Sequence, residues 1–240
     1  MRSKAILAIL IIIVSFGSIF AISGNTIIAH RGASSYEIEN SLESFEKAIE
    51  LEADMIEFDV QKTLDNELIV YHDLKLNGVQ VKDAEYNYIE ENTNYHVPLL
   101  QEVLEKLSGR TKIDIDIKKK GYEIEVVESS LNYFNKSDII ISSRSEESLK
   151  MIKKDYNITT MIILGNTNKE KIGLFFGFLP EKRIEESGAD YIAMNNLFVG
   201  KRILAKAEKM GKQVFVWNVG KYKGVRGPKV QGLIVKNPIK

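Results

Sequence analysis

Short, wholly apolar segments alternate along the chain with longer segments whose apolar residues recur every three or four positions. The first pattern predicts buried strands and the second predicts amphipathic helices. The predicted strands are 26–29, 54–60, 67–71, 112–117, 138–142, 159–164, 191–194, 214–217 and 232–235. The predicted helices are 41–51, 97–107, 123–134, 146–153, 175–186 and 201–210.

Strands that are apolar on both faces, with helices between them, indicate a parallel sheet covered by helices. About eight such units favour an α/β fold of the (β/α)8 TIM-barrel type over an open doubly wound sheet. The stretch 24–240 is short for this fold, so we expect little insertion between the units. No linker, repeat or low-complexity segment divides this stretch, which is therefore predicted to form one barrel domain.

The N-terminus has the pattern of a targeting segment. Two basic residues precede a mostly apolar run over 5–22, and Ala21 and Ser23 provide small residues at the spacing that signal peptidase reads. The run is also nearly long enough to span a bilayer as an uncleaved anchor. We predict that 1–23 is a signal peptide or a membrane anchor, and that the protein is exported to the exterior or the membrane surface.

The amino-acid composition limits which partners and which metal ligands the protein can have. The chain has 33 basic and 33 acidic residues, so no strong net field favours nucleic acid, and no nucleic-acid partner is predicted. The absence of cysteine excludes disulfides, thiolate metal sites and cysteine nucleophiles. Any metal must therefore be bound by oxygen or imidazole ligands. The sequence makes no prediction of the oligomeric state.

Histidines end two of the predicted strands. His30 ends the first strand and His72 follows the strand over 67–71. Functional side chains of a TIM barrel come from the carboxyl ends of its strands, so these two histidines are predicted to act as acid and base. The third histidine, His96, has no charged partner in its strand-like neighbourhood and is predicted to be structural.

Acidic residues repeat at a spacing of two, which places them on one face of a strand. Glu57 and Asp59 share the second strand, and Asp114 and Asp116 share the fourth. Carboxylates that converge from adjacent strands suit magnesium or calcium, and such a cation polarises a phosphoryl oxygen. Two basic residues, Arg31 and Lys118, follow strand ends and are placed to bind the remaining phosphate oxygens.

These residues match a known pattern. His30-Arg31-Gly32, followed by Glu39-Asn40-Ser41, resembles the HRG…PENT opening of the glycerophosphodiester phosphodiesterase family. Further blocks that are similar to those of the family follow in order at 53–63, 68–73, 97–104, 115–118 and 214–219. The resemblance runs from about residue 26 to the C-terminus and is strongest up to residue 118.

The resemblance implies a barrel that hydrolyses a glycerophosphodiester, derived from phospholipid or a wall polymer, to glycerol 3-phosphate and an alcohol. It implies a divalent cation, Mg or Ca, on Glu57, Asp59 and Asp116, with His30 and His72 as the catalytic pair. The substrate-binding residues that it implies are Arg31, Lys118 and Trp217. The supporting residues are Glu39, Gly32 and Asn40, with Gly32 placed where a side chain would obstruct the phosphate.

Four residues depart from the family pattern. Asp116 replaces a glutamate, Ile38 a proline, Arg144 an aromatic residue and Lys236 an acid. The shorter Asp116 must reach the metal differently, for instance through water. The added cations either favour a more anionic substrate or lie on the surface. The basic segment 221–230 is also too short for the usual last helix.

Two alternatives therefore stay open. The same chemistry could act on a membrane lipid, as a lysophospholipase D or sphingomyelinase D does, and an N-terminal anchor would favour such a substrate. A barrel that binds phosphodiesters without turnover is the other alternative, suggested by Asp116 and Lys236.

Overall fold

The computed structural model describes residues 25–165, 167–219 and 230–239. The predicted signal peptide or anchor over 1–23 lies outside the described residues, as does nearly all of the basic segment 221–230. Within the described residues, no helix is both long enough and apolar enough to cross a membrane.

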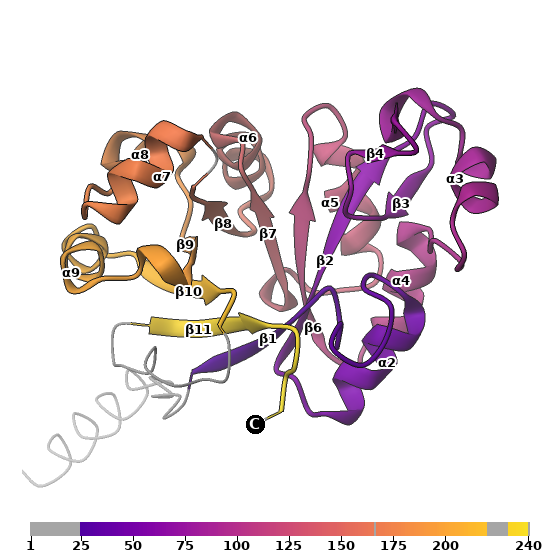
Figure 1. The fold of residues 1–240 in the computed structure, drawn as a ribbon, viewed down its shortest axis with the longest axis horizontal. Coiled ribbons are helices and arrows are strands. Elements are labelled where there is room, and N and C mark those ends of the chain that lie inside the picture. Colours follow the sequence, from indigo (N-terminus) through magenta and orange to yellow (C-terminus); the bar gives the residue numbers. More distant parts are fainter. Residues whose placement is uncertain (1–24, 166, 220–229, 240) are drawn as a thin grey trace, which may run out of the picture.

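Parallel strands close into a barrel in the described part of the chain (Figure 1). The barrel strands are β1 (Thr26–His30), β2 (Met55–Lys62), β6 (Lys112–Ile117), β7 (Ile139–Ser143), β8 (Thr159–Ile163), β9 (Tyr191–Asn195), β10 (Gln213–Trp217) and β11 (Val230–Val235). Because β1 pairs in parallel with both β2 and β11, the sheet has no free edge within the barrel. The predicted (β/α)8 TIM barrel is confirmed.

Helices surround the strands, and most of them bury an apolar face against the strands. They are α2 (Leu42–Glu50), α4 (Leu100–Leu107), α5 (Glu123–Leu131), α6 (Glu146–Tyr156), α7 (Asn168–Phe175), α8 (Glu181–Ser187) and α9 (Lys201–Lys209). The prediction of a single helix over 175–186 is wrong. The structure has two helices in this part of the chain, α7 and α8. The break between them, over 176–180, ends at Pro180, which has no N–H to continue a helix.

The strand predicted over 67–71 is not a barrel strand. It is present as β3 (Leu68–Val70), which pairs antiparallel with β2, with Val70 opposite Val60. The tight turn after β2 allows only an antiparallel return, because a parallel partner needs a long crossover. The chain therefore comes back over the end of the barrel, where Tyr71 N–H donates to the carbonyl of Asp59 at 3.0 Å.

The rest of the connection between β2 and β6 is the main insertion in the barrel. It contains the small hairpin β4 (Lys75–Leu76) and β5 (Val79–Gln80), a 3-10 turn η1 (Val81–Asp83) and the helix α3 (Tyr86–Asn92). These elements have their own small core around Ile69, Ile89 and Val97. The sequence pattern did not predict them, because each is too short for a clear period.

His96 has charged partners, contrary to the expectation from sequence. Its Nδ1 lies 3.1 Å from Glu90 of α3, and its Nε2 lies 3.1 Å from Glu102 of α4. The partners are six residues away on either side, which is why the local pattern missed them. His96 lies outside the pocket described below and links α3 to α4.

This link predicts a pH effect on stability. Burial opposes the charge of His96, but hydrogen bonds to Glu90 and Glu102 outweigh it and raise the pKa above its ordinary 6.5. The charged form contributes fully below about pH 6.5 and the contribution is lost as pH rises through the raised pKa. Because His96 and its two glutamate partners are partly exposed, we expect this contribution to the free energy of unfolding to be less than about 1 kcal/mol.

The measurement is urea unfolding of wild type and His96→Gln at about pH 5.5 and about pH 9. The wild type should exceed the variant in free energy of unfolding at the lower pH, and the difference should shrink at the higher one. A constant difference would contradict the assignment.

Candidate active site

The loop after β1 depends on a backbone that turns sharply. Arg31 and Gly32 both have positive φ, 55° and 75°, and the Arg31 N–H donates to Glu57 Oε2 at 2.8 Å. A Cβ on Gly32 would lie 2.7 Å from the carbonyl carbon and oxygen of Ser44. Gly32 is therefore needed for close packing against α2. The expectation that it also clears space for the phosphate stays a prediction.

Gly32→Ala should lower the free energy of unfolding by about 2–5 kcal/mol, because it adds overpacking to left-handed strain. Gly109→Ala is the matched control, since Gly109 has φ 70° and nothing within 4 Å of the added Cβ. The control should lose only about 1–2 kcal/mol. Denaturant unfolding of both variants measures the difference, and equal losses would contradict the packing argument.

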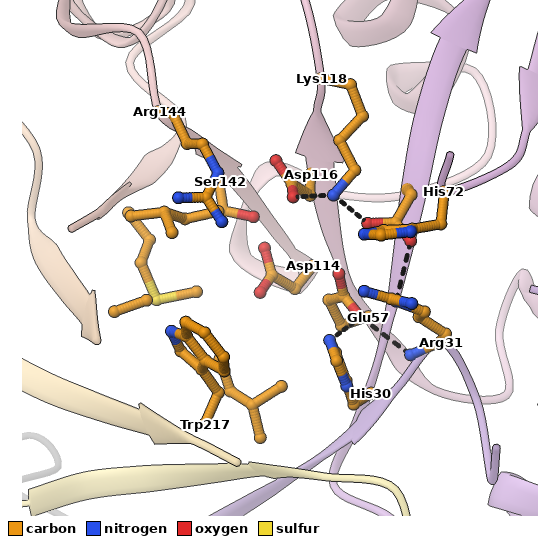
Figure 2. Close-up of a pocket in the computed structure, with 15 residues that line it drawn as sticks. His30, Arg31, Glu57, His72, Asp114, Asp116, Lys118, Ser142, Arg144 and Trp217 are labelled. Carbon is orange, nitrogen blue, oxygen red and sulfur yellow. Dashed lines mark hydrogen bonds and ion pairs between the residues drawn. The ribbon is translucent and has the colours of Figure 1, made fainter. Parts of the chain in front are cut away.

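Register between β2 and β6 gathers the acidic residues. Glu57 lies opposite Asp114 and Asp59 lies opposite Asp116, so the two acidic pairs form one buried group inside the barrel (Figure 2). Glu57, Asp59 and Asp116 each offer a ligand atom, and these atoms all lie within 4.8 Å of one another. The shorter Asp116 thus reaches the group directly because its strand is in register.

Two basic side chains form ion pairs with this acidic group. Lys118 Nζ lies 2.5 Å from Asp59 Oδ1 and 2.6 Å from Asp116 Oδ2, and Arg31 Nε lies 3.1 Å from Asp59 Oδ2. Burial alone would raise the pKa of Asp59, but these cations outweigh it and hold the pKa below its usual range. Burial likewise opposes the charge of Lys118, whose pKa is raised by the carboxylates.

The predicted supporting residues hold Arg31 and Asp59 in place. Glu39 Oε1 lies 2.7 Å from Arg31 Nη1, and Asn40 Nδ2 donates to Asp59 Oδ2 at 2.8 Å. Asn40 has φ 60°, a conformation that asparagine tolerates better than most residues. Both residues therefore act through their neighbours and do not line the pocket.

The donor set fits a divalent cation. Four buried carboxylates, those of Glu57, Asp59, Asp114 and Asp116, face the two cations of Arg31 and Lys118. Burial and the charge of Asp59 raise the pKa of Glu57 well above its usual value, and the buried Asp116 Oδ1 receives no hydrogen bond. An all-oxygen site with surplus negative charge suits a hard ion such as Mg²⁺ or Ca²⁺.

Two histidines face the same pocket. His30 Nε2 lies 3.9 Å from Glu57 Oε2, and burial together with the Arg31 charge lowers the pKa of His30 to about 3. His72 Nδ1 lies 2.8 Å from Asp73 Oδ1. This contact orients the second ring and leaves its Nε2 for the pocket. The pocket thus brings together the two histidines that sequence placed at strand ends.

The opposite wall of the pocket is largely apolar. Trp217 lies there (Figure 2). The lining of this wall is completed by Met161, Ile163, Ala193 and Ile234. Arg144 also lines the pocket, so it is not merely a surface residue. Lys236 is exposed and outside the lining, although its charge is among those that lower the pKa of His30.

Asp114 and Ser142 line the pocket but were not among the predicted site residues. Asp114 is fully buried, and burial, reinforced by the charge of Asp116, raises its pKa to about 8. The i, i+2 repeat on β6 was the signal for Asp114. Ser142 carries no such signal, because one serine at a strand end is common.

A match to a family model identifies the protein family of this chain. The model described as "Glycerophosphoryl diester phosphodiesterase family" matches residues 30–240, which include every strand of the barrel except most of β1. The chain belongs to this family. Glycerophosphoryl diester phosphodiesterases are phosphoric diester hydrolases, and this chain is a hydrolase of that class.

Relatives agree with the family model. A glycerophosphodiester phosphodiesterase of Bacillus subtilis is 31% identical over an alignment of 204 positions that covers 70% of this chain and 69% of that protein. Two further relatives of that name, from Bacillus altitudinis and Caldanaerobacter subterraneus, are 35% and 32% identical over alignments that cover 53% of this chain and 61% of each relative.

Solved structures share the fold. The Thermotoga maritima glycerophosphodiester phosphodiesterase has a TM-score of 0.72 at 26% identity, over 90% of this chain and 96% of that one. An Oleispira antarctica phosphodiesterase, in complex with the product sn-glycerol-3-phosphate, has a TM-score of 0.71 at 17% identity, over 89% and 94%.

Proposed function

We propose that this barrel hydrolyses glycerophosphodiesters to glycerol 3-phosphate and an alcohol with the help of a divalent cation, Mg²⁺ or Ca²⁺. The observation that carries the proposal is the single pocket in which Glu57, Asp59 and Asp116 lie beside two histidines and two phosphate-binding cations. The glycerol 3-phosphate bound to the Oleispira antarctica protein supports the product class.

Glu57, Asp59 and Asp116 would hold the cation, which supplies Lewis-acid polarisation of a phosphoryl oxygen when bound. Lys118 and Arg31 contribute positive charge next to these carboxylates, where phosphate oxygens can receive their N–H groups. The side chains of Lys118 and Arg31 are each fixed by a carboxylate, so they need little reorganisation when substrate binds.

Hydrolysis needs two proton transfers, one from the attacking oxygen and one to the departing alcohol oxygen. His30 and His72 provide a nitrogen for each in the same pocket. The neutral His30 can accept a proton at Nε2, and His72 is held by Asp73 with its Nε2 free for transfer. The apolar wall around Trp217 excludes water from the non-reacting part of the substrate.

The test is release of glycerol 3-phosphate from glycerophosphocholine-type substrates by the full chain, with and without added Mg²⁺ or Ca²⁺. A parallel panel of lysophospholipids and sphingomyelin separates deacylated from acylated diesters. Turnover of the deacylated diesters supports the proposal. Cleavage of acylated diesters alone, or calorimetric binding with no product, would replace it by the lysophospholipase D or sphingomyelinase D type of reaction or by the binding barrel.

Residues 1–23 motivate a second proposal, that the reaction takes place outside the cytoplasm. The basic start, the apolar run and the small residues at 21 and 23 support export. The mass of the mature protein recovered from the medium and from the membrane fraction distinguishes cleavage from anchoring. Recovery of the full-length chain from the cytoplasm alone would refute export.

A further inference from the structure

A cluster of large apolar side chains is exposed on α7, on the segment after it and on the 3-10 turn η3 (Asn196–Phe198). Only Leu174 of α7 is buried. The cluster, here called the α7 patch, consists of Ile172, Phe175, Phe176, Phe178 and Leu197, exposed by 59%, 69%, 63%, 67% and 73%. Contiguous apolar surface of this kind marks an interaction site on a soluble domain.

Local contacts join these residues into one surface. The Phe175 and Phe176 rings meet edge to face at 5.5 Å between centroids. Phe178 folds back on α7, where its N–H donates to the Gly173 carbonyl at 2.9 Å. The turn η3, which carries Leu197, packs against α7. The patch is therefore held by ordered backbone.

The α7 patch lies at the catalytic end of the barrel. The helix α7 follows the carboxyl end of β8 and η3 follows the carboxyl end of β9, the ends at which the active-site residues lie (Figure 1). A groove lined by Lys169 and Phe178 adjoins the catalytic pocket, because Arg144 lines both. The patch is thus continuous with the mouth of the site.

Basic residues surround the α7 patch. Lys169 and Lys171 lie on α7, and α9 brings Arg202 and Lys206 to the same side. The Lys206 ammonium lies 5.8 Å from the centroid of the Phe178 ring while also pairing with Glu181 at 3.4 Å. The Arg202 stem lies within 3.3 Å of a Cβ placed on Gly177.

Acidic residues balance only part of this charge. Over 167–178 and 196–206 five basic residues stand against one acid, Glu170, whose Oε1 pairs with Arg183 at 2.6 Å. The neighbouring Glu181 pairs with Lys206. Aromatic residues in the centre with long basic side chains at the rim form the composition that binds the interface of an anionic bilayer. Each basic residue near such a surface adds favourable attraction.

We propose that the α7 patch docks the catalytic end of the barrel on a lipid bilayer that carries anionic head groups. A second copy of the chain is the weaker occupant, because a two-fold contact through the patch would bring the basic rim against itself. A bilayer instead supplies both the apolar layer for the phenylalanines and the anionic layer for the rim. Docking there places the pocket mouth beside lipid-derived phosphodiesters.

The first test is flotation of the full chain with phosphatidylglycerol–phosphatidylcholine vesicles and with pure phosphatidylcholine vesicles. The triple variant Phe175→Ser, Phe176→Ser, Phe178→Ser should lose about tenfold or more of its partition into the anionic vesicles. Ile124→Ser, which alters an exposed apolar residue of α5, is the matched control and should bind as wild type. Because 5–22 is present in every chain, only the difference between variants counts.

The second test reports on the patch directly. The chain has no cysteine, so Phe176→Cys and Ser137→Cys each accept one environment-sensitive fluorophore. Ser137 is the control, because it lies in the 3-10 turn η2 (Lys136–Asp138), before the amino end of β7. Emission should shift to the blue and be quenched by brominated lipid at position 176 only.

Two results would overturn docking whether or not 5–22 inserts into the vesicles: equal signals at 176 and 137, or self-association without lipid that the triple variant abolishes. The outcome is separable from that of the proposed function. The triple variant should hydrolyse a water-soluble glycerophosphodiester at the wild-type rate, since none of its three residues lines the catalytic pocket.

Discussion

His72→Ala should lower kcat for a glycerophosphodiester by roughly 10²–10⁴-fold, the usual contribution of a positioned acid or base. The substitution removes a proton-transfer group at the pocket wall that Asp73 holds at 2.8 Å. His72 is partly exposed, so the barrel should stay folded and the loss should appear in kcat. Release of glycerol 3-phosphate at saturating substrate measures it.

The third histidine is the control. His96→Ala changes the same residue type outside the pocket and should keep the wild-type kcat. The double variant His30→Ala, His72→Ala should lose less than the product of the two single losses, because the pair serves one reaction. A His72→Ala enzyme with unchanged kcat would remove His72 from the mechanism.

Removal of divalent cations should reduce turnover by about 10³-fold or more, because Lewis-acid assistance contributes several kcal/mol to transition-state stabilisation. Asp116→Asn should weaken cation binding, since it removes one of three carboxylates that meet within 4.8 Å. Asp59 is less suitable for this test. Its loss would break two ion pairs at once, leaving Lys118 with Asp116 and Arg31 with Glu39 as their remaining partners, and breaking a buried pair destabilises the fold by about 3–5 kcal/mol.

Thermal unfolding gives a readout that does not depend on activity. Cation at about 100 times its Kd should stabilise the wild type by about 2.7 kcal/mol, and Asp116→Asn should show less at the same concentration. Asp83→Asn, at an exposed acid of η1, should respond as wild type. Equal stabilisation of all three chains would show that the cation binds elsewhere.

Hydrophobic periodicity was enough to predict most of the fold. Each strand of the barrel is buried on both faces, and so its apolar run stands out in sequence without knowledge of its neighbours. The elements that were missed or mistaken, α3, the two short helices at 168–187 and the direction of β3, are short. Their form depends on what they pack against, which no local pattern contains.

The site was predictable where one strand carries the information. Glu57 and Asp59 lie two apart on β2 and His30 ends β1, so local geometry alone points these groups to the barrel mouth. His72 was chosen correctly as a pocket residue, but for an incomplete reason. It reaches the pocket because β3 turns back over β2, not because it ends a barrel strand.

The sequence by itself determined that apolar strands alternate with helices, that the ligands must be oxygen or imidazole, and that acids and histidines gather near strand ends. Only the tertiary structure decided which of these groups meet. The register of β6 on β2 set Asp114 and Asp116 against Glu57 and Asp59, and closure of the barrel brought Trp217 and Arg144 to the opposite wall. The reason is physical: strand periodicity is a property of neighbouring residues, whereas register and closure depend on pairing between segments far apart in the chain.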